Sequence, residues 1–404
     1  MMWAYPEPLT PWVVGFAVVF GLCFGSFANV MALRLLSESA KQDALLQEEL
    51  EKAEQEKQSQ DKPEQDSQTE GEPVPTPEPS LGLVEFIKEF FKSYGEVIQL
   101  VSHPPSHCPG CMTPIKPIDN IPVLSYLMLG GKCRHCKAGI SPIYPAFELF
   151  CAVLFGAVVF QFGVSLQSLF LLFMMFNFVV ITITDLKESY IFQINSLTLI
   201  PAGILYNVLN LGQTPDMVVS LGSWAMTMPE GLLSGLLGIA LAFIFFEGMI
   251  LLSETVFGTE GFGHGDTHLM MGVGAFLGWP LTALSLALGF VLQSVLAIPM
   301  LVFQWIKNKN YPSLTSGGLA MAFVALPLWL MNLPKGHPLA EQANTLSLVS
   351  LFLCLVCLVY FLKLVKENQT YTYVPLGPAL VLGSVVSLFW GQPLLAAIAK
   401  LYGY

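Results

Sequence analysis

Two cysteine pairs in the first third of the chain have the spacing of a metal site. Cys108 and Cys111 form one Cys-x-x-Cys motif, and Cys133 and Cys136 form a second after 21 intervening residues. This arrangement is typical of paired zinc knuckles, in which two turns present four thiolates to one Zn²⁺. Four sulfur ligands leave no open position for water, so the pattern predicts a structural zinc. The alternative is a pair of metal-free or redox-active motifs.

Two aspartates lie at the edges of apolar segments, where an ionisable side chain is costly and usually functional. Asp185 ends the run LFLLFMMFNFVVITIT, and Asp266 ends a Gly263-His-Gly265-Asp266 segment before another apolar run. Two carboxyl groups that approach each other share a proton, so one can activate water while the other polarises a carbonyl. The glycines would let the backbone come close to an extended substrate. The simpler alternatives are a helix-end charge for Asp185 and a helix cap for Asp266.

Apolar helices must position these residues. Of the 404 residues, 54% are hydrophobic and 12% are charged, against roughly 25% charged residues in a soluble domain. The apolar runs reach the length of about 20 residues that a membrane-spanning helix needs, and they are continuous, which favours helices over the alternating strands of a barrel. We therefore predict an all-α polytopic membrane protein with about eight to ten transmembrane helices. The candidate spans are 12–34, 146–163, 167–185, 192–210, 231–253, 267–280, 281–305, 316–333, 344–363 and 374–397.

The placement of lysine and arginine predicts the orientation of these spans. If the loop after the first span is cytoplasmic, 16 of the 18 basic residues lie inside and only Lys335 and Lys400 lie outside. The N-terminus is then outside, and both aspartates and all four motif cysteines lie at the cytoplasmic side. The first span is expected to act as an uncleaved signal, because it lacks a basic n-region and an A-x-A cleavage site. A cytoplasmic location also favours a metal site over disulfides.

The segment between the first span and the cysteines is strongly acidic. Residues 37–80 hold 13 acidic and 4 basic residues, which account for most of the formal net charge of −11. Their composition predicts a disordered linker, with a solvated helix allowed over 41–58. No basic patch accompanies it, which argues against nucleic-acid binding. The spacing of apolar residues over 83–101 predicts an amphipathic helix on the membrane or on the bundle.

The predicted spans and the changes in composition between them divide the chain into four parts. They are an N-terminal transmembrane helix (1–36), the acidic linker (37–80), a cytoplasmic module with the amphipathic helix and the zinc knuckle (81–145), and a transmembrane bundle (146–404).

Several blocks resemble the type IV prepilin peptidase family of membrane GxGD-type aspartyl proteases. GLCFGSFANVMALRL (21–35) is similar to the family's first span, and residues 104–149 are similar to its cytoplasmic zinc module. EGFGHGDTHLMMGVGAFLGW (260–279) resembles the block that carries its second catalytic aspartate. Leu-Gly-Pro (376–378) matches a late Phe-Gly-Pro in two positions.

The resemblance implies a function for the sites. Asp185 and Asp266 would be the catalytic pair, and the glycines with His268 would support the active-site loop. The substrates would be type IV prepilins and type II secretion pseudopilins in the bacterial cytoplasmic (inner) membrane. Many members also N-methylate the new N-terminus with S-adenosylmethionine, which the resemblance implies here; no methyl-donor site stands out in the sequence.

Two departures from the family keep alternatives open. Phe192-Gln193 stands where the family has Pro-Asp, and His268 replaces a lysine, so a permanent cation becomes titratable. A catalytically altered relative could act as a membrane scaffold for pilus or secretion assembly, and a peptidase could have lost methyl transfer. A proton-coupled transporter is a further alternative, against which the zinc motif and the missing repeat symmetry argue.

Two glutamates near or within apolar spans have expected roles of their own. Glu148 matches a family block, which implies a structural or methyltransferase-related role. Glu247 is expected to meet a polar group or a water-filled cavity.

Overall fold

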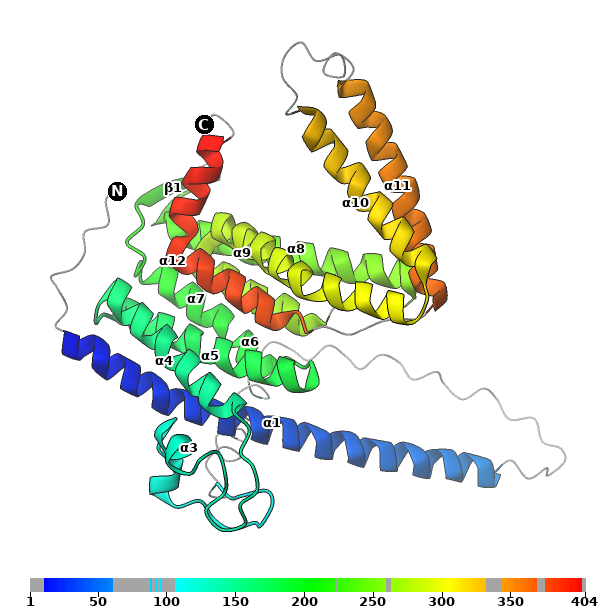
Figure 1. The fold of residues 1–404 in the computed structure, drawn as a ribbon. Coiled ribbons are helices and arrows are strands. Elements are labelled where there is room, and N and C mark those ends of the chain that lie inside the picture. The colour runs from blue at the N-terminus through cyan, green and yellow to red at the C-terminus, as the bar shows by residue number, and fades with distance from the viewer. Residues whose placement is uncertain are drawn as a thin grey trace.

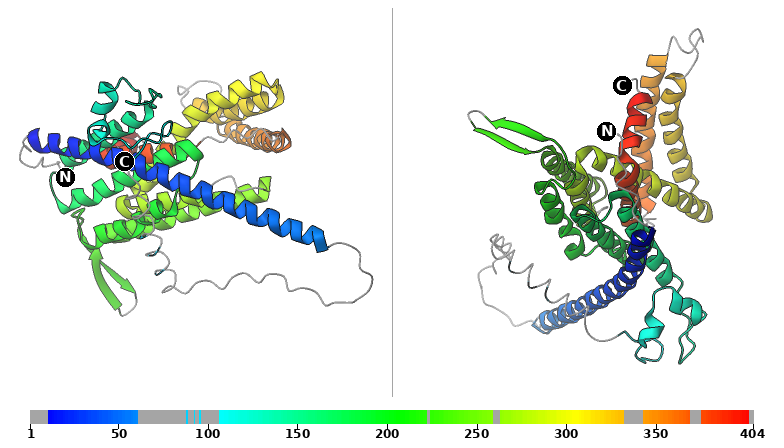
Figure 2. Two further views of the ribbon diagram at one scale, coloured as in Figure 1. Left: turned by 90° about the horizontal axis from the view of Figure 1, so that it is seen from below. Right: turned by 90° about the vertical axis from the view of Figure 1, so that its left-hand side faces the viewer.

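The computed structural model describes residues 11–60, 106–221, 224–258, 263–331, 343–368 and 375–401, together with Lys88, Lys92 and Gly95. Its helices form a bundle from which a β-hairpin and a small loop-rich module project in different directions (Figures 1 and 2). We call the loop-rich part, residues 106–142, the tetracysteine module. In chain order the elements are α1 Pro11–Gln60, the 3-10 helix η1 Pro117–Asn120, α3 Leu124–Met128, α4 Ile143–Phe162, α5 Leu166–Glu188, α6 Gln193–Leu197, α7 Leu199–Val208, β1 Asp216–Leu221, β2 Trp224–Pro229, α8 Glu230–Phe257, α9 His264–Lys307, α10 Tyr311–Met331, α11 Ala343–Asn368 and α12 Gly377–Leu401.

The predicted class, an all-α polytopic membrane protein, is confirmed. Within the described residues, six helices are long and apolar enough to cross a membrane, namely those at the start of α1 and in α4, α5, α8, α9 and α12. Two shorter apolar helices, Leu314–Pro327 and Leu348–Cys357, lie in α10 and α11. The chain is therefore a multi-pass membrane protein.

Helix α9 contains both of the spans predicted over 267–280 and 281–305. Thr267 lies 3.5 Å from Glu247 in α8, and the Phe290 ring lies 5.6 Å from the Phe245 ring in the same part of α8. These two α9 residues stand on opposite sides of Gly278 at similar separations along the chain, so the chain must reverse between them. Gly278 has a φ of 76° and a ψ of 167°, which only glycine adopts without strain.

The predicted span 192–210 is divided in the structure into α6 and α7. The break follows Leu197, and Pro201 lies four residues further on. A proline ring clashes with the carbonyl group four residues before it, so one continuous helix is disfavoured here.

The sequence did not indicate the two-stranded antiparallel sheet between α7 and α8. Strands β1 and β2 pair from Asp216 opposite Pro229 to Leu221 opposite Trp224. It is a small β-element in an otherwise helical fold.

Helix α1 does not end with the membrane span. It continues to Gln60, with ion pairs between Glu38 and Lys41 at 3.0 Å and between Glu48 and Lys52 at 2.7 Å. The solvated helix allowed over 41–58 is therefore present, and residues 37–40 are helical as well. The rest of the expected linker, and most of the amphipathic helix expected over 83–101, lie outside the described residues.

The core of the bundle lies around α5, which contacts α1, α4, α6, α7 and α12. Every residue from Asn177 to Asp185 is buried. A helix that is apolar on all sides belongs in the interior of a bundle. The fold therefore holds the end of α5, with its aspartate, between neighbouring helices.

Candidate active site and metal centre

Each Cys-x-x-Cys motif lies in a tight backbone loop. In the first, the amide of Cys108 donates to Thr113 O at 3.0 Å, and that of Met112 donates to Cys108 O at 2.7 Å. In the second, Cys133 N donates to Ala138 O at 2.8 Å, and Lys137 N donates to Cys133 O at 3.1 Å. The residue after each second cysteine has a positive φ, 56° at Met112 and 61° at Lys137. The two motifs are thus built as equivalent knuckles.

The two knuckles face each other and bring their sulfurs together. The Sγ atoms of all four cysteines lie within 4.8 Å of one another, and those of Cys108 and Cys136 are 3.7 Å apart. A tetrahedral zinc with Zn–S bonds of about 2.3 Å needs sulfurs about 3.8 Å apart. The donor set and its dimensions therefore fit a four-coordinate metal ion.

The thiols have unequal affinities for protons. Hydrogen bonds from the Thr113 hydroxyl and then its backbone lower the pKa of Cys111 to about 6. A backbone hydrogen bond at Ala138 lowers the pKa of Cys136, but desolvation and the neighbouring cysteines outweigh it and raise the value to about 11. Four adjacent thiolates repel one another, so a bound dication would balance their charge.

An ion pair ties the second knuckle to η1. The Nε of Arg134 donates to both carboxylate oxygens of Asp119 at 3.1 and 2.9 Å, and its Nη2 donates to Oδ1 at 2.6 Å. The Arg134 guanidinium holds the pKa of Asp119 below its usual range. Bidentate pairs of this kind fix geometry as well as charge.

Asp185 lies in the last turn of α5 and is 3% exposed. Its Oδ2 accepts a hydrogen bond from the backbone amide of Gly377, at the start of α12, at 2.8 Å. A Cβ atom at position 377 would lie 2.7 Å from this oxygen, so the approach requires glycine. This partner is 192 residues away along the chain.

Asp266 lies in the first turn of α9 and is 6% exposed. Its buried Oδ1 has no hydrogen-bond partner among the described residues. An unpaired buried carboxyl oxygen is costly, so this oxygen is available to bind a water molecule or a polar group of a ligand.

The two aspartates belong to one site. A Cβ at Gly265 would lie 2.7 Å from Cβ of Ile191, and one at Gly377 would lie 3.3 Å from Cδ1 of the same isoleucine. Ile191 is thus next to both the turn before Asp266 and the backbone partner of Asp185.

The other residues singled out in the sequence have separate environments. Gly263 is exposed, whereas Gly265 packs against Ile191. Of these two glycines, only Gly263 therefore has a backbone that an extended substrate could reach. His268 is half-buried, and its buried Nδ1 has no partner among the described residues. Phe192 precedes α6 and packs edge-on against Tyr190. None of these contacts involves the carboxyl group of Asp185 or Asp266.

Glu247 finds the polar partners that the sequence led us to expect. Its Oε1 lies 3.3 Å from Nδ1 of His264 and 3.5 Å from the hydroxyl of Thr267. Both partners flank Asp266 in the first turn of α9, so α8 holds this turn from the side.

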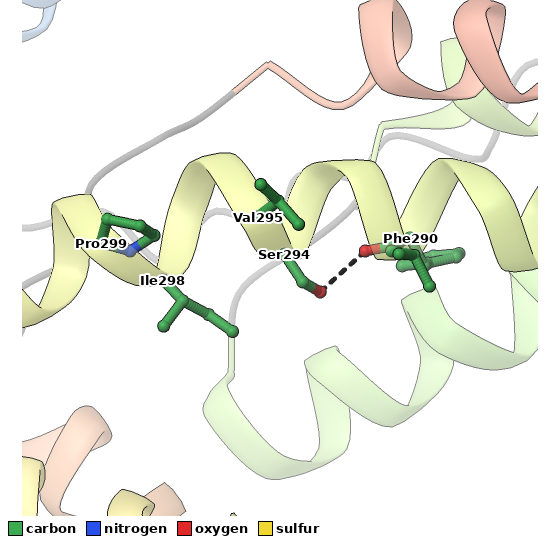
Figure 3. Close-up of a pocket in the computed structure, with 6 residues that line it drawn as sticks. Phe290, Ser294, Val295, Ile298 and Pro299 are labelled. Atoms are coloured by element: carbon green, nitrogen blue, oxygen red, sulfur yellow. Dashed lines mark hydrogen bonds between the residues drawn. The ribbon is translucent and has the colours of Figure 1, made fainter.

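An apolar hollow on the second half of α9 contains none of the expected site residues (Figure 3). Its polar group is the Ser294 hydroxyl, which donates to Phe290 O at 2.7 Å. The lining residues are Phe290, Val291, Ser294, Val295, Ile298 and Pro299.

Sequence reasoning missed the role of two residues in the aspartate site, Gly377 and Ile191. The Leu-Gly-Pro match included the glycine without indicating what it contacts. No signal in the sequence marked the isoleucine.

The fold and the two sites define a polytopic membrane protein with a tetracysteine module and a pair of buried aspartates. Residues 19–162 match the model of the bacterial peptidase A24 N-terminal domain, and residues 169–298 match that of the type IV leader peptidase family. Gly377 lies outside both matched ranges.

Three curated relatives are named prepilin leader peptidase/N-methyltransferase. The protein of Pseudomonas aeruginosa is 31% identical over 198 residues, which are 49% of this chain and 62% of the relative. That of Stutzerimonas stutzeri is 33% identical over 201 residues, or 50% and 64%. That of Neisseria gonorrhoeae is 32% identical over 218 residues, or 53% and 69%.

The chain belongs to the type IV leader peptidase family. It spans a little under two thirds of the length of the first two of these relatives. No solved structure matches it.

Proposed function

We propose that this chain is a membrane aspartyl endopeptidase that removes the leader peptides of type IV prepilins and type II secretion pseudopilins. One observation carries the proposal. Asp185 and Asp266 are both buried, and Ile191 packs against Gly265, next to Asp266, and against Gly377, the backbone partner of Asp185. One carboxyl oxygen of Asp266 has no partner among the described residues. Both aspartates lie within the range that matches the type IV leader peptidase family.

The different surroundings of the two carboxyl groups suggest their roles. Asp185 accepts a backbone hydrogen bond, which stabilises its negative charge. Oδ1 of Asp266 has no hydrogen-bond donor among the described residues, so its negative charge is less stabilised and Asp266 holds the shared proton. Asp185 therefore takes a proton from water as the water oxygen bonds to the scissile carbonyl carbon. Asp266 donates its proton to the carbonyl oxygen, which gives a gem-diol intermediate. As the C–N bond breaks, Asp185 passes the proton that it took from water to the leaving amine, and a hydroxyl group of the intermediate returns a proton to Asp266, so that both carboxyl groups regain their starting state.

The orientation follows from charge and from the helix ends. Asp185 lies at the end of α5 and Asp266 at the start of α9. We infer that α6 with α7 crosses the membrane in one direction and α8 crosses it in the other, which puts both aspartates on the same side. The excess of basic residues in the loop that follows the first span makes this the cytoplasmic side. The chain then lies in the bacterial cytoplasmic (inner) membrane with its N-terminus outside.

The tetracysteine module would hold a structural Zn²⁺ through Cys108, Cys111, Cys133 and Cys136. Sulfur donors in a tetrahedral arrangement select zinc over the oxygen-preferring cations. The bound ion would neutralise the thiolates and fix the two knuckles. The curated relatives are also named N-methyltransferases, and we extend that activity, with S-adenosylmethionine as methyl donor, to this chain.

The test is cleavage of several prepilin peptides by the purified protein in detergent, with products identified by mass spectrometry. One cut at the junction of the leader and the apolar helix is expected. In the presence of S-adenosylmethionine the mature product should gain about 14 Da, the mass of one added CH₂ on methylation. A folded wild-type protein that cuts none of the peptides would instead favour a scaffold role, in line with the departures at His268 and Phe192-Gln193.

A further inference from the structure

Glu148 joins three separate parts of the chain. It lies one turn inside α4 and is buried. Its Oε2 accepts a hydrogen bond at 2.6 Å from the backbone amide of Val123, in the tetracysteine module between the two knuckles. The Ser26 side chain of α1 hydrogen-bonds the same carboxylate. Helix α1 can come this close because a Cβ at Gly25 would lie 2.7 Å from Cα of Glu148.

The backbone at Val123 needs such a partner. Val123 precedes α3 with a φ of 59° and a ψ of −49°. A β-branched residue adopts a positive φ only where surrounding contacts hold it there. A hydrogen bond from an amide to a carboxylate is among the stronger ones available. The carboxylate of Glu148 therefore holds the module at a strained point of its backbone.

The same end of α4 contacts the helix that carries Asp185. Asn29 of α1 donates to Tyr144 O at 3.2 Å, and the Lys187 ammonium lies 5.4 Å from the centre of the Tyr144 ring. Lys187 follows Asp185 by two residues on α5. The module is thus fixed to the bundle beside the end of the helix that bears the aspartate.

The geometry of Glu148 differs from that of Asp266. Two donors already occupy the Glu148 carboxylate, whereas in the described part of the chain Oδ1 of Asp266 has no hydrogen-bond partner. We propose that Glu148 is a positioning residue, which anchors the tetracysteine module beside the end of α5 that carries Asp185, where it contributes to binding the substrate. The effect on cleavage rests on the proposed function. Asp185 keeps its bond to Gly377 of α12 without this anchor, so Glu148 governs substrate binding and leaves the chemical step intact.

Hydrogen exchange measured by mass spectrometry on the full-length protein tests the anchor directly. In Glu148→Ala, a peptide covering residues 121–129 should exchange at least about tenfold faster, because a charged hydrogen bond is lost. Glu148→Gln keeps an acceptor oxygen and should stay within about threefold of wild type. Glu148→Asp retains the charge but is shorter by one methylene, so it should resemble the alanine variant. Glu254→Ala, at an exposed position on α8, is the matched control.

Cleavage kinetics test the positioning role. For Glu148→Ala and Glu148→Asp we expect KM for a prepilin peptide to rise about tenfold with kcat within about twofold, the signature of lost uniform binding. The Gln variant should restore KM, and Glu254→Ala should change neither constant.

Unchanged exchange over 121–129 in both the Ala and Asp variants would overturn the anchor. Faster exchange with an unchanged KM would overturn the positioning role. If the wild-type protein cleaves no prepilin, the proposed function fails, and with it the effect on KM. The exchange comparison then decides the anchor alone.

Discussion

Replacement of Gly377 by alanine is the sharpest perturbation of the aspartate site that leaves both aspartates in place. The new Cβ would lie 2.7 Å from Asp185 Oδ2, closer than real Cβ atoms approach an oxygen. The aspartate side chain is short and buried, so it must move and give up its 2.8 Å bond to the Gly377 amide. A hydrogen bond to a charged group contributes about 1.5–3 kcal/mol.

If that bond supports the reacting carboxylate, its loss should lower kcat by about 10- to 150-fold, since each 1.36 kcal/mol corresponds to tenfold in rate. The assay is cleavage of a prepilin peptide at saturating concentration, normalised to folded protein.

Gly383→Ala is the matched control for this variant. It lies in the same helix, and its Cβ would come 2.6 Å from Ser285 O, so it should disturb packing without touching Asp185. We expect a lower melting temperature in both variants and a lower kcat in Gly377→Ala alone. A Gly377→Ala protein that is folded and has a kcat within about twofold of wild type would refute the role given to this hydrogen bond.

Three further predictions concern the module and the altered position in the active-site block. The purified protein should contain one zinc per chain, and Cys108→Ser or Cys133→Ser should lose it and become more sensitive to protease over 106–142; a metal-free wild type would contradict the structural site. Asp119→Asn should destabilise the module at pH 7. The folded-state pKa of Asp119 lies below its unfolded value, so its contribution is present above the unfolded pKa and is lost as pH falls through the folded-state pKa. The difference in stability between wild type and variant should begin to shrink below about pH 4 and then disappear as pH falls further; a difference that does not shrink would contradict this origin. His268→Lys restores a permanent cation and should flatten the pH dependence of cleavage between about pH 5.5 and 8; identical profiles would show that the charge at 268 does not matter.

The cysteine and aspartate positions could be predicted because their signals are local. Two Cys-x-x-Cys motifs at this spacing indicate paired knuckles. An aspartate at the end of an apolar run is predicted to lie at the edge of the membrane. The break after Leu197 could also have been predicted, because the ring of Pro201 clashes with the carbonyl group four residues before it.

The partners of these residues could not be predicted in the same way. Gly377 meets Asp185 only after α12 packs beside α5, and nothing near either residue encodes that contact. The bond between Glu148 and Val123 likewise depends on how the module folds back onto α4. The β-hairpin between α7 and α8 was missed because short strands outside the membrane give a weak signal next to long apolar runs.

The central claim is that Asp185 and Asp266 act as one catalytic unit. Its most direct test is the prepilin cleavage rate of Asp185→Asn, Asp266→Asn and the double variant, because asparagine keeps the shape and removes the carboxyl group. Each single variant should lose cleavage as completely as the double variant, since the effects of residues that act as a unit are not additive. Substantial cleavage by either single variant, with the protein folded and inserted in detergent, would contradict the account.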